Sequence, residues 1–219
     1  MLQPNKLSQQ ASFANEQKIA RLACNLVIEI NFQKLKVLCV TFNNLKTNRN
    51  LNVESLEDVI NFLCEKKAML VTAESCTAGM VTSLLADVPG CGSILDIGYV
   101  VYTEHAKHCC LGVNLQTMNI FGLTSEEVAR EMALGALQRS SANFSVAITG
   151  TAESDDELNG VVCFAYATTI NDVQKVTSET HKFVGERNEV RHLAAMHAIK
   201  SIPIQYEKFH NGEGDIFYE

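Results

Sequence analysis

Apolar and polar positions alternate along most of the chain with two distinct periods, and these periods predict where helices and strands lie. From residue 53 the run VESLEDVINFLCEKK repeats its apolar residues at helical spacing, which predicts a helix over 53–67. A short apolar run predicts a strand over 68–73. After the polar turn ESCT a second helix is predicted over 78–88, where Pro89 and Gly90 end it.

The pattern continues to residue 201 as an alternation of strands and helices. A short helix should end at Gly112, and Thr124 or Ser125 should cap a longer one. The predicted ranges are strand 94–103, helix 105–113, helix 126–140, strands 144–149, 161–169 and 176–184, and helix 186–201. This order predicts an α/β fold, a single three-layer domain with a mostly parallel or mixed sheet flanked by helices.

The two ends of the chain fall outside this alternation. Residues 1–48 combine a Gln/Asn-rich start with two strand-like runs, LVIEINF and LKVLCVTF, and we treat them as an N-terminal appendage of unknown role. The segment could be an extra hairpin or a dimerisation arm, or it could result from a start codon assigned too far upstream; the sequence does not choose between these. Residues 49–205 form the predicted domain, and residues 206–219 are expected to be a disordered C-terminal tail.

Composition narrows the expected partners. The formal net charge is -7 and no Lys/Arg-rich run is present, so we do not expect the chain to bind a nucleic acid. Binding of a small anion is compatible with this charge, because a few local N–H groups and one cation suffice for it. Charges interrupt the apolar stretch 19–42, which fits neither a signal peptide nor a membrane span. The 8 cysteines form no CxxC pair and no zinc-type Cys/His spacing, so we expect reduced thiols in a cytoplasmic protein without a metal.

The junction TAESCTAG between a strand and a helix is the most informative candidate site. Ser75 lies just before the predicted helix, where the free N–H groups of Cys76, Thr77 or Ala78 could stabilise an oxyanion while the serine attacks a carbonyl. The alternative is that Ser75 or Thr77 only caps the helix. A thiol nucleophile at Cys76 is also considered, although a cysteine in that position is more often a small buried apolar residue.

A serine nucleophile needs a base, and the segment YTEHAKHCC offers three. Lys107 qualifies only if burial or a nearby cation lowers its pKa, whereas His105 and His108 need no such shift. The residues alone do not choose between them.

Two later segments have features of ligand contacts. Thr149 and Gly150 begin the loop ITGTAESDDELNG, where a glycine lets the backbone approach a ligand, although the acidic centre of the loop suits a solvated turn. Arg187 begins a helix in VGERNEVR, a position that suits a phosphate. A surface pairing of Arg187 with Glu186 or Glu189 fits the sequence equally well.

Several motifs in order resemble the CinA C-terminal-domain family of nicotinamide-nucleotide amidases. They are TAESCTAG, PGCGSILDIGYVVYTEHAKHCCLGV, GLTSEEVAREMALGA, AITGTA, NGVV and VGERNEVRHLA, spanning about residues 52–201. The resemblance implies hydrolysis of nicotinamide mononucleotide to nicotinate mononucleotide and ammonia, without a metal or other cofactor, in a cytoplasmic homodimer.

The same resemblance implies residue roles. Ser75 is the expected nucleophile, Lys107 the expected base, and Tyr102 a proton-relay or positioning group. The expected substrate contacts are Glu74, Cys76, Thr77, Gly79, Thr149, Gly150 and Arg187.

The sequence also departs from the family pattern. Residues that differ are Ala78 in the usual TGG, Glu104 in the usual YSN, Gly92 after PG, and Glu153-Ser154 in place of Gly-Pro. The acidic loop around Thr151–Ser154, with Asp155 and Asp156 following, would repel an anionic nucleotide. A catalytically silent paralogue that binds a nucleotide or a protein, and a serine amidase for another small amide, are therefore the alternatives.

Overall fold

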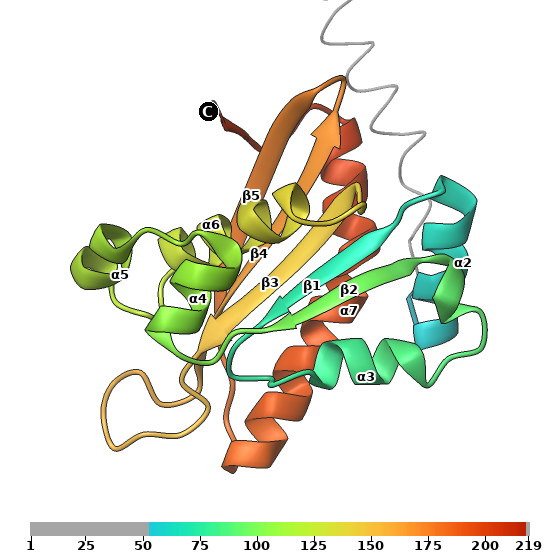
Figure 1. Ribbon diagram of the computed structural model, residues 1–219. Coiled ribbons are helices and arrows are strands. Elements are labelled where there is room, and N and C mark those ends of the chain that lie inside the picture. The colour runs from blue at the N-terminus through green and yellow to red at the C-terminus, as the bar shows by residue number, and fades with distance from the viewer. Residues whose placement is uncertain (1–52, 218–219) are drawn as a thin grey trace, which may run out of the picture. The chain divides into compact units, whose positions relative to one another are not determined.

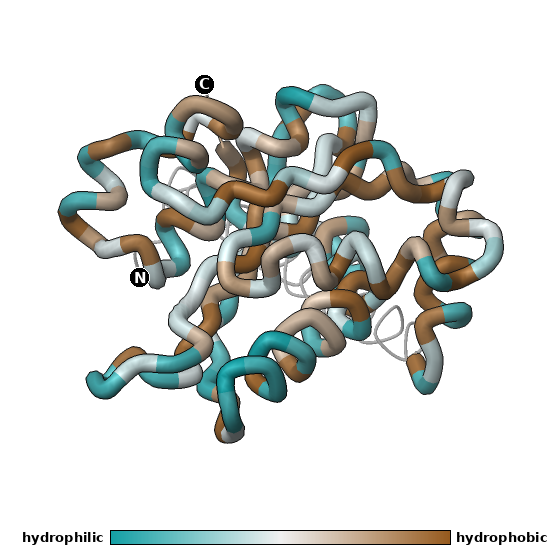
Figure 2. Tube along the Cα trace, turned by 60° about the horizontal axis from the view of Figure 1, so that its bottom comes forward, coloured by the Kyte–Doolittle hydropathy of each residue, from teal (hydrophilic) through white to brown (hydrophobic). Residues whose placement is uncertain are grey.

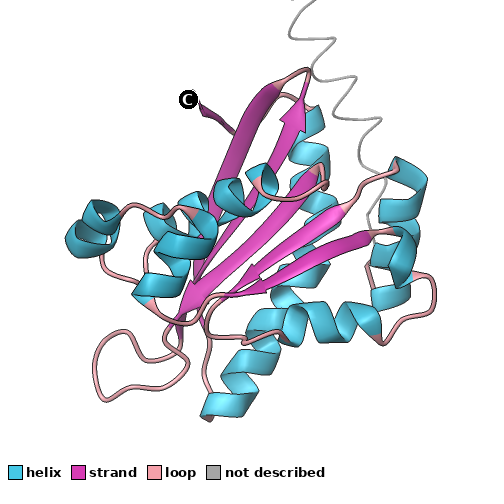
Figure 3. Ribbon diagram, viewed as in Figure 1, coloured by secondary structure: helices cyan, strands magenta, loops and turns pink. Residues whose placement is uncertain are grey.

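A mixed six-stranded sheet forms the centre of the computed structural model, which describes residues 53–217 (Figures 1 and 3). The strand order is β2-β1-β3-β4-β5-β6, in which β2, β1 and β3 are parallel and the other strands pair antiparallel. The strands are β1 (Leu70–Glu74), β2 (Leu95–Val100), β3 (Phe144–Gly150), β4 (Val161–Ile170), β5 (Val173–Lys182) and β6 (Asp215–Phe217).

Helices cover both faces of the sheet, so the domain has three layers (Figure 1). One face packs against α2 (Leu56–Lys66), α3 (Met80–Ala86) and α7 (Arg187–His210). The other packs against α4 (Glu104–Leu111), α5 (Leu115–Phe121) and α6 (Glu126–Gln138). The predicted α/β class and the flanked, mixed sheet are confirmed.

Local sequence signals explain where the helices begin and end. Ser55 caps α2 and forms a reciprocal capping box with Asp58. Ser125, rather than Thr124, caps α6 by accepting a hydrogen bond from the N–H of Val128. Gly112 ends α4 as predicted, in the left-handed conformation with φ 76°.

Two apolar cores, one on each face, hold the layers together. The buried residues of β1, β3 and β4 alternate between the core under α7 and the core under α6. In Figure 2 brown, apolar segments run through the central strands, whereas teal segments are concentrated in loops and outer turns. Within residues 53–217 no helix combines the length and the apolar character needed to cross a bilayer.

The predicted disordered tail is wrong for the residues that the structure describes. The last helix, α7, continues past Pro203 to His210, and residues 215–217 then pair with β5. A proline inside a helix removes one hydrogen bond, but here Ile202 and Phe209 are buried on either side of it. Packing therefore extends the helix beyond the point at which local sequence signals end it.

Two other predictions need comment. The helix α5 was not predicted, because its seven residues lie between two stronger helical patterns. The proposed appendage and its strand-like runs lie outside the described residues. The chain divides into units at Leu51/Asn52.

One row of residues crosses four strands and matters for the sites below. Glu74 on β1 pairs with Ile148, Ile148 with Phe164, and Phe164 with Glu179 on β5. Paired residues point to the same face of a sheet. The side chains of Glu74 and Glu179 accordingly lie on the face covered by α3 and α7.

Candidate active site

Ser75 lies at the carboxyl end of β1 in a tight turn, residues 75–79, which we call the nucleophile turn. The helix α3 begins only at Met80, two residues later than predicted. Ala78 and Gly79 both have positive φ, 52° and 92°, which turns the chain sharply between strand and helix. Figure 1 places the end of β1, the loop after β3 and the start of α7 at the same edge of the sheet, where α/β folds commonly bind ligands.

Lys107 and Ser75 form a buried pair. Thr103 caps α4 and sets its first turn, from which the Lys107 side chain reaches Ser75 with Nζ 2.9 Å from Oγ. The two residues are 1% and 6% exposed. The structure therefore brings together the two residues that were expected to supply the nucleophile and the base.

The other contacts of Lys107 are to two backbone carbonyls. Its Nζ donates to the carbonyl oxygen of Val101 at 3.2 Å and to that of Tyr102 at 3.3 Å, in addition to the Ser75 hydroxyl. After loss of one proton, a neutral amine would keep two N–H donors for the two carbonyls and would have one lone pair to accept the Ser75 hydroxyl proton. Within residues 53–217 Lys107 makes no ion pair.

Burial favours that neutral form. Desolvation lowers the pKa of Lys107 from its ordinary value, and the weaker interaction with Cys76 acts in the opposite direction. A lysine with a lowered pKa can serve as a general base nearer to neutral pH.

Cys76 is poorly suited to be the nucleophile. Its side chain is 6% exposed, and burial raises the pKa of the thiol to about 11 despite the neighbouring N–H groups and Lys107. The reactive form of a cysteine is the thiolate. At neutral pH this thiol is protonated and behaves as a small apolar group.

The backbone of the nucleophile turn offers two N–H donors that no oxygen of the described residues accepts. The N–H of Ala78 donates to the carbonyl oxygen of Ser75 at 3.1 Å, which removes it from the three expected donors. Among the described residues no protein oxygen accepts from the N–H of Cys76 or Thr77. These two N–H groups are the candidates for an oxyanion hole beside Ser75.

Arg191 orients that backbone, and the sequence analysis did not select it. Its Nε lies 3.0 Å from the Cys76 carbonyl oxygen, and its Nη2 lies 3.1 Å from that of Thr77. A peptide unit is planar and trans, so a carbonyl held on one side fixes the N–H on the other. Arg191 is one helical turn after Arg187 on α7, and this spacing was the one sequence signal for it.

Glu74 has a different role from the expected substrate contact. It is 0% exposed, and its carboxylate accepts from the N–H groups of Gly79, Val81 and Thr82 and from the Thr82 hydroxyl at 2.8–3.1 Å. These bonds satisfy the first donors of α3. Glu74 thus positions the nucleophile turn, because its carboxylate is buried and bonded to the start of α3.

Tyr102 and Arg187 contact each other rather than the buried pair. The Tyr102 side chain is 53% exposed, and its hydroxyl accepts from Arg187 Nη2 at 3.1 Å. Only the backbone carbonyl of Tyr102 contacts Lys107. The Arg187–Tyr102 pair lies beside the site, and the guanidinium has further N–H donors that this contact does not use.

Thr149 and Gly150 are explained by packing. The hydroxyl of Thr149, which is 1% exposed, donates to the carbonyl oxygen of Leu123 at 2.7 Å. A Cβ on Gly150 would come within 2.7 Å of the Val161 carbonyl oxygen, so the glycine lets β4 approach β3. The glycine was expected to admit a ligand, and it admits a neighbouring strand instead.

The two histidines considered as bases face elsewhere. His108 Nδ1 lies 2.9 Å from the carbonyl oxygen of Val113, and the His105 ring contacts the Cys109 sulfur. Both are exposed on α4. Of the three candidate bases, Lys107 is the one that contacts Ser75.

Comparison with known proteins shows the family of the domain. A model of the CinA C-terminal domain matches residues 52–204. The chain belongs to the CinA C-terminal-domain family. It is 39% identical over 153 residues to a putative competence-damage inducible protein of Clostridium beijerinckii, covering 68% of this chain and 36% of that protein. A CinA-like protein of Chlorobium phaeobacteroides is 42% identical over 135 residues, covering 59% and 32%. The chain thus matches about a third of the length of these relatives.

Solved structures of the family share the fold of this CinA domain. The competence/damage inducible protein CihA of Agrobacterium tumefaciens superposes with a TM-score of 0.63 at 31% identity, covering 72% of this chain and 93% of that one. A CinA superfamily protein of Escherichia coli gives a TM-score of 0.63 at 30% identity, covering 70% and 92%.

The loop that departs from the family pattern is ordered by its own side chains in this CinA domain. Asp156 accepts from the Ser154 hydroxyl at 2.6 Å and from the Leu158 N–H at 2.9 Å, and the first of these bonds is the main cause of its lowered pKa. Glu153 and Asp155 are exposed. The loop therefore brings negative charge to the edge of the sheet that carries Ser75.

Proposed function

We propose that this CinA domain is an amidase that hydrolyses the carboxamide of nicotinamide mononucleotide, with Ser75 as nucleophile and Lys107 as base. The observation that carries the proposal is the 2.9 Å contact between Lys107 Nζ and Ser75 Oγ in a buried setting. Activation of a serine by an adjacent base is the arrangement that nucleophilic acyl transfer requires.

The proton transfers of the proposed reaction can all be assigned to Ser75, Lys107, water and the substrate. Neutral Lys107 takes the Ser75 proton as Oγ bonds to the carboxamide carbon, and the Cys76 and Thr77 N–H groups face the oxyanion. Lys107 returns the proton to the nitrogen, the C–N bond breaks, and ammonia leaves. Lys107 then takes a proton from water as the water oxygen bonds to the acyl carbon. The bond from that carbon to Oγ breaks, Lys107 returns the proton to Ser75, and the acid product loses its own proton to solvent to become the carboxylate.

Arg187 is the proposed phosphate contact. It begins α7 and is exposed beside Tyr102, so its remaining donors and the first N–H groups of the helix can meet an anion. Binding of the phosphate would hold the carboxamide in place for attack.

The deciding experiment measures ammonia release from nicotinamide mononucleotide by the purified chain. Ser75→Ala and Lys107→Ala should each lower kcat by at least about 1,000-fold, because the pair acts as a unit. Cys76→Ala and His105→Ala are the matched controls and should retain activity. A folded wild type that releases no ammonia, or a Ser75→Ala variant as active as wild type, would contradict the proposal.

A second candidate is a serine amidase for another small amide that carries no phosphate, which the exposed Glu153 and Asp155 favour. Nicotinamide riboside lacks the phosphate and separates the two. If nicotinamide mononucleotide is the substrate, Arg187→Gln should raise its KM by about tenfold, the loss of one charged contact, and leave that of the riboside unchanged. A wild type that prefers the riboside would favour the second candidate.

A further inference from the structure

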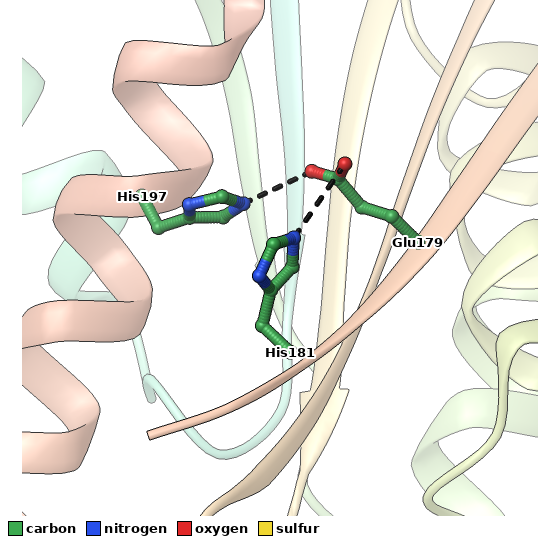
Figure 4. A group of neighbouring side chains, drawn as sticks. All are labelled: Glu179, His181 and His197. Atoms are coloured by element: carbon green, nitrogen blue, oxygen red, sulfur yellow. Dashed lines mark hydrogen bonds and ion pairs between the residues drawn. The ribbon is translucent and has the colours of Figure 1, made fainter. Parts of the chain in front are cut away.

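A second polar cluster lies on the α7 face of the sheet, away from the nucleophile turn. It consists of Glu179 and His181 on β5 and His197 on α7. Residues 179 and 181 are two apart on a strand, so both point to the same face, where α7 presents His197. Figure 4 shows both imidazole rings turned toward the single carboxylate.

The three side chains lie close enough together to share one ion. Glu179 Oε1 lies 3.0 Å from His197 Nε2, and Oε2 lies 3.6 Å from His181 Nε2. One ligand atom from each residue lies within 4.8 Å of the others. A tetrahedral zinc ion with bonds of about 2.0–2.1 Å separates its ligand atoms by about 3.3–3.4 Å, so a small inward movement of these side chains would complete the geometry.

Neighbouring phenylalanine rings pack against the two imidazoles, and the cluster remains accessible to solvent. Phe164 packs 4.9 Å from the His197 ring and Phe183 6.2 Å from the His181 ring, centroid to centroid. The side chains of Glu179, His197 and His181 are 27%, 27% and 42% exposed, so an ion can enter from solvent.

The donor types of the cluster also suit a cation. Two histidines and one glutamate are the donor set of a well-known class of zinc sites with three protein ligands. A divalent ion would neutralise the partly buried negative charge.

We propose that Glu179, His181 and His197 bind a divalent transition-metal ion of the zinc class, with the fourth coordination position open to water. The ion would tie β5 to α7 at a point six residues after Arg191, about 9 Å along the helix. The proposal does not depend on the amidase activity, because none of the three ligands touches Ser75 or Lys107.

The test is titration of the chelator-treated full chain with Zn²⁺ against a chromophoric competitor. One equivalent should bind, and Co²⁺ in its place should give ligand-field absorption bands. His181→Ala and His197→Ala should each weaken binding by at least about 100-fold, the upper range for loss of a group that only supports a ligand. Glu179→Gln preserves shape and should weaken binding in the same direction.

Controls separate this site from other thiols and imidazoles. His192→Ala changes an exposed histidine on the same helix and should leave binding intact. Cys109→Ala removes the His105–Cys109 contact on α4 and should do the same. Zn²⁺ should also raise the Tm of wild type and of Ser75→Ala, but not of His197→Ala. Absence of saturable binding, or binding lost in Cys109→Ala and retained in His197→Ala, would overturn the proposal.

Discussion

The parallel and antiparallel halves of the sheet use polar residues in opposite ways. In the parallel half, Glu74, Ser75 and Lys107 are almost completely buried, and their polar atoms contact one another or backbone. In the antiparallel half, Glu179 and His197 are 27% exposed and make contacts that solvent can reach. The polar cluster of the parallel half is thus shielded from water, whereas the polar cluster of the antiparallel half remains accessible to it.

Burial of a polar group can therefore favour activity and lower stability at the same time. Burial of Lys107 shifts its pKa in the direction that a base requires, but burying an amine without an opposite charge is unfavourable for the folded state. A residue that is needed for chemistry and costs stability is a common feature of active sites. Variants can measure both sides of this comparison.

The largest effect is expected for Lys107→Met. The substitution keeps an unbranched apolar side chain of similar reach and removes the amine, so kcat for ammonia release should fall by at least about 1,000-fold while Tm rises. Tyr166→Phe, on the antiparallel β4, is the control: it removes a buried hydroxyl and should leave kcat unchanged. A Lys107→Met variant with a lower Tm would contradict the assigned cost of burial.

The same lysine predicts a pH dependence. The rate should rise with pH and level off below 10.5, the ordinary pKa of lysine, because only the neutral amine accepts the serine proton. Between the folded and unfolded pKa values of Lys107 the unfolded chain binds more protons, so stability should also rise with pH there. In Lys107→Met this rise in stability should be absent, as denaturant titrations at several pH values can show.

A smaller effect is expected for Glu74→Gln. The amide keeps one acceptor oxygen but sets its NH₂ against backbone donors, so the free energy of unfolding should fall by about 1–3 kcal/mol. Glu179→Gln, in the same row of the sheet but partly exposed, should cost less in metal-free protein. If urea titration showed the same loss of unfolding free energy in both variants, the contrast between the two halves of the sheet would be wrong.

The smallest effect is expected for Arg191→Gln, which tests the link between the halves. Loss of the guanidinium should lower kcat by about tenfold, roughly 1.4 kcal/mol, because the Thr77 N–H loses its fixed direction. KM should change little, unlike in Arg187→Gln. An Arg191→Gln variant that changes only KM would make Arg191 a substrate contact instead of a positioning residue.

The sequence predicted the central elements better than the C-terminal end of the chain. The strands and helices from Leu56 to Gly150 follow from local periods and caps, with α5 missed. The end of α7 and the strand β6 depend on contacts between residues far apart in sequence, such as Phe144 with Phe209 and Val176 with Asp215. Local signals hold no information on such contacts.

The candidate site shows the same limit. Ser75 was a candidate from its position before a helix, whereas Lys107 was chosen over His105 and His108 only through the family resemblance. The role of Glu74 was not predictable, because the sequence does not say that its carboxylate turns toward α3. Arg191 was missed because a guanidinium that holds backbone carbonyls cannot be told from a surface arginine until the helix is docked.

The row of paired residues from Glu74 to Glu179 fixes a length as well as an arrangement. Three strand spacings of about 4.8 Å place the two backbones about 14 Å apart, and hydrogen-bond ladders set that separation independently of side-chain packing. The sheet therefore fixes the distance between the histidine cluster and the nucleophile turn. A paramagnetic ion bound at the cluster would change the nuclear relaxation of a small molecule bound beside Ser75, and the size of that change would report the distance between them.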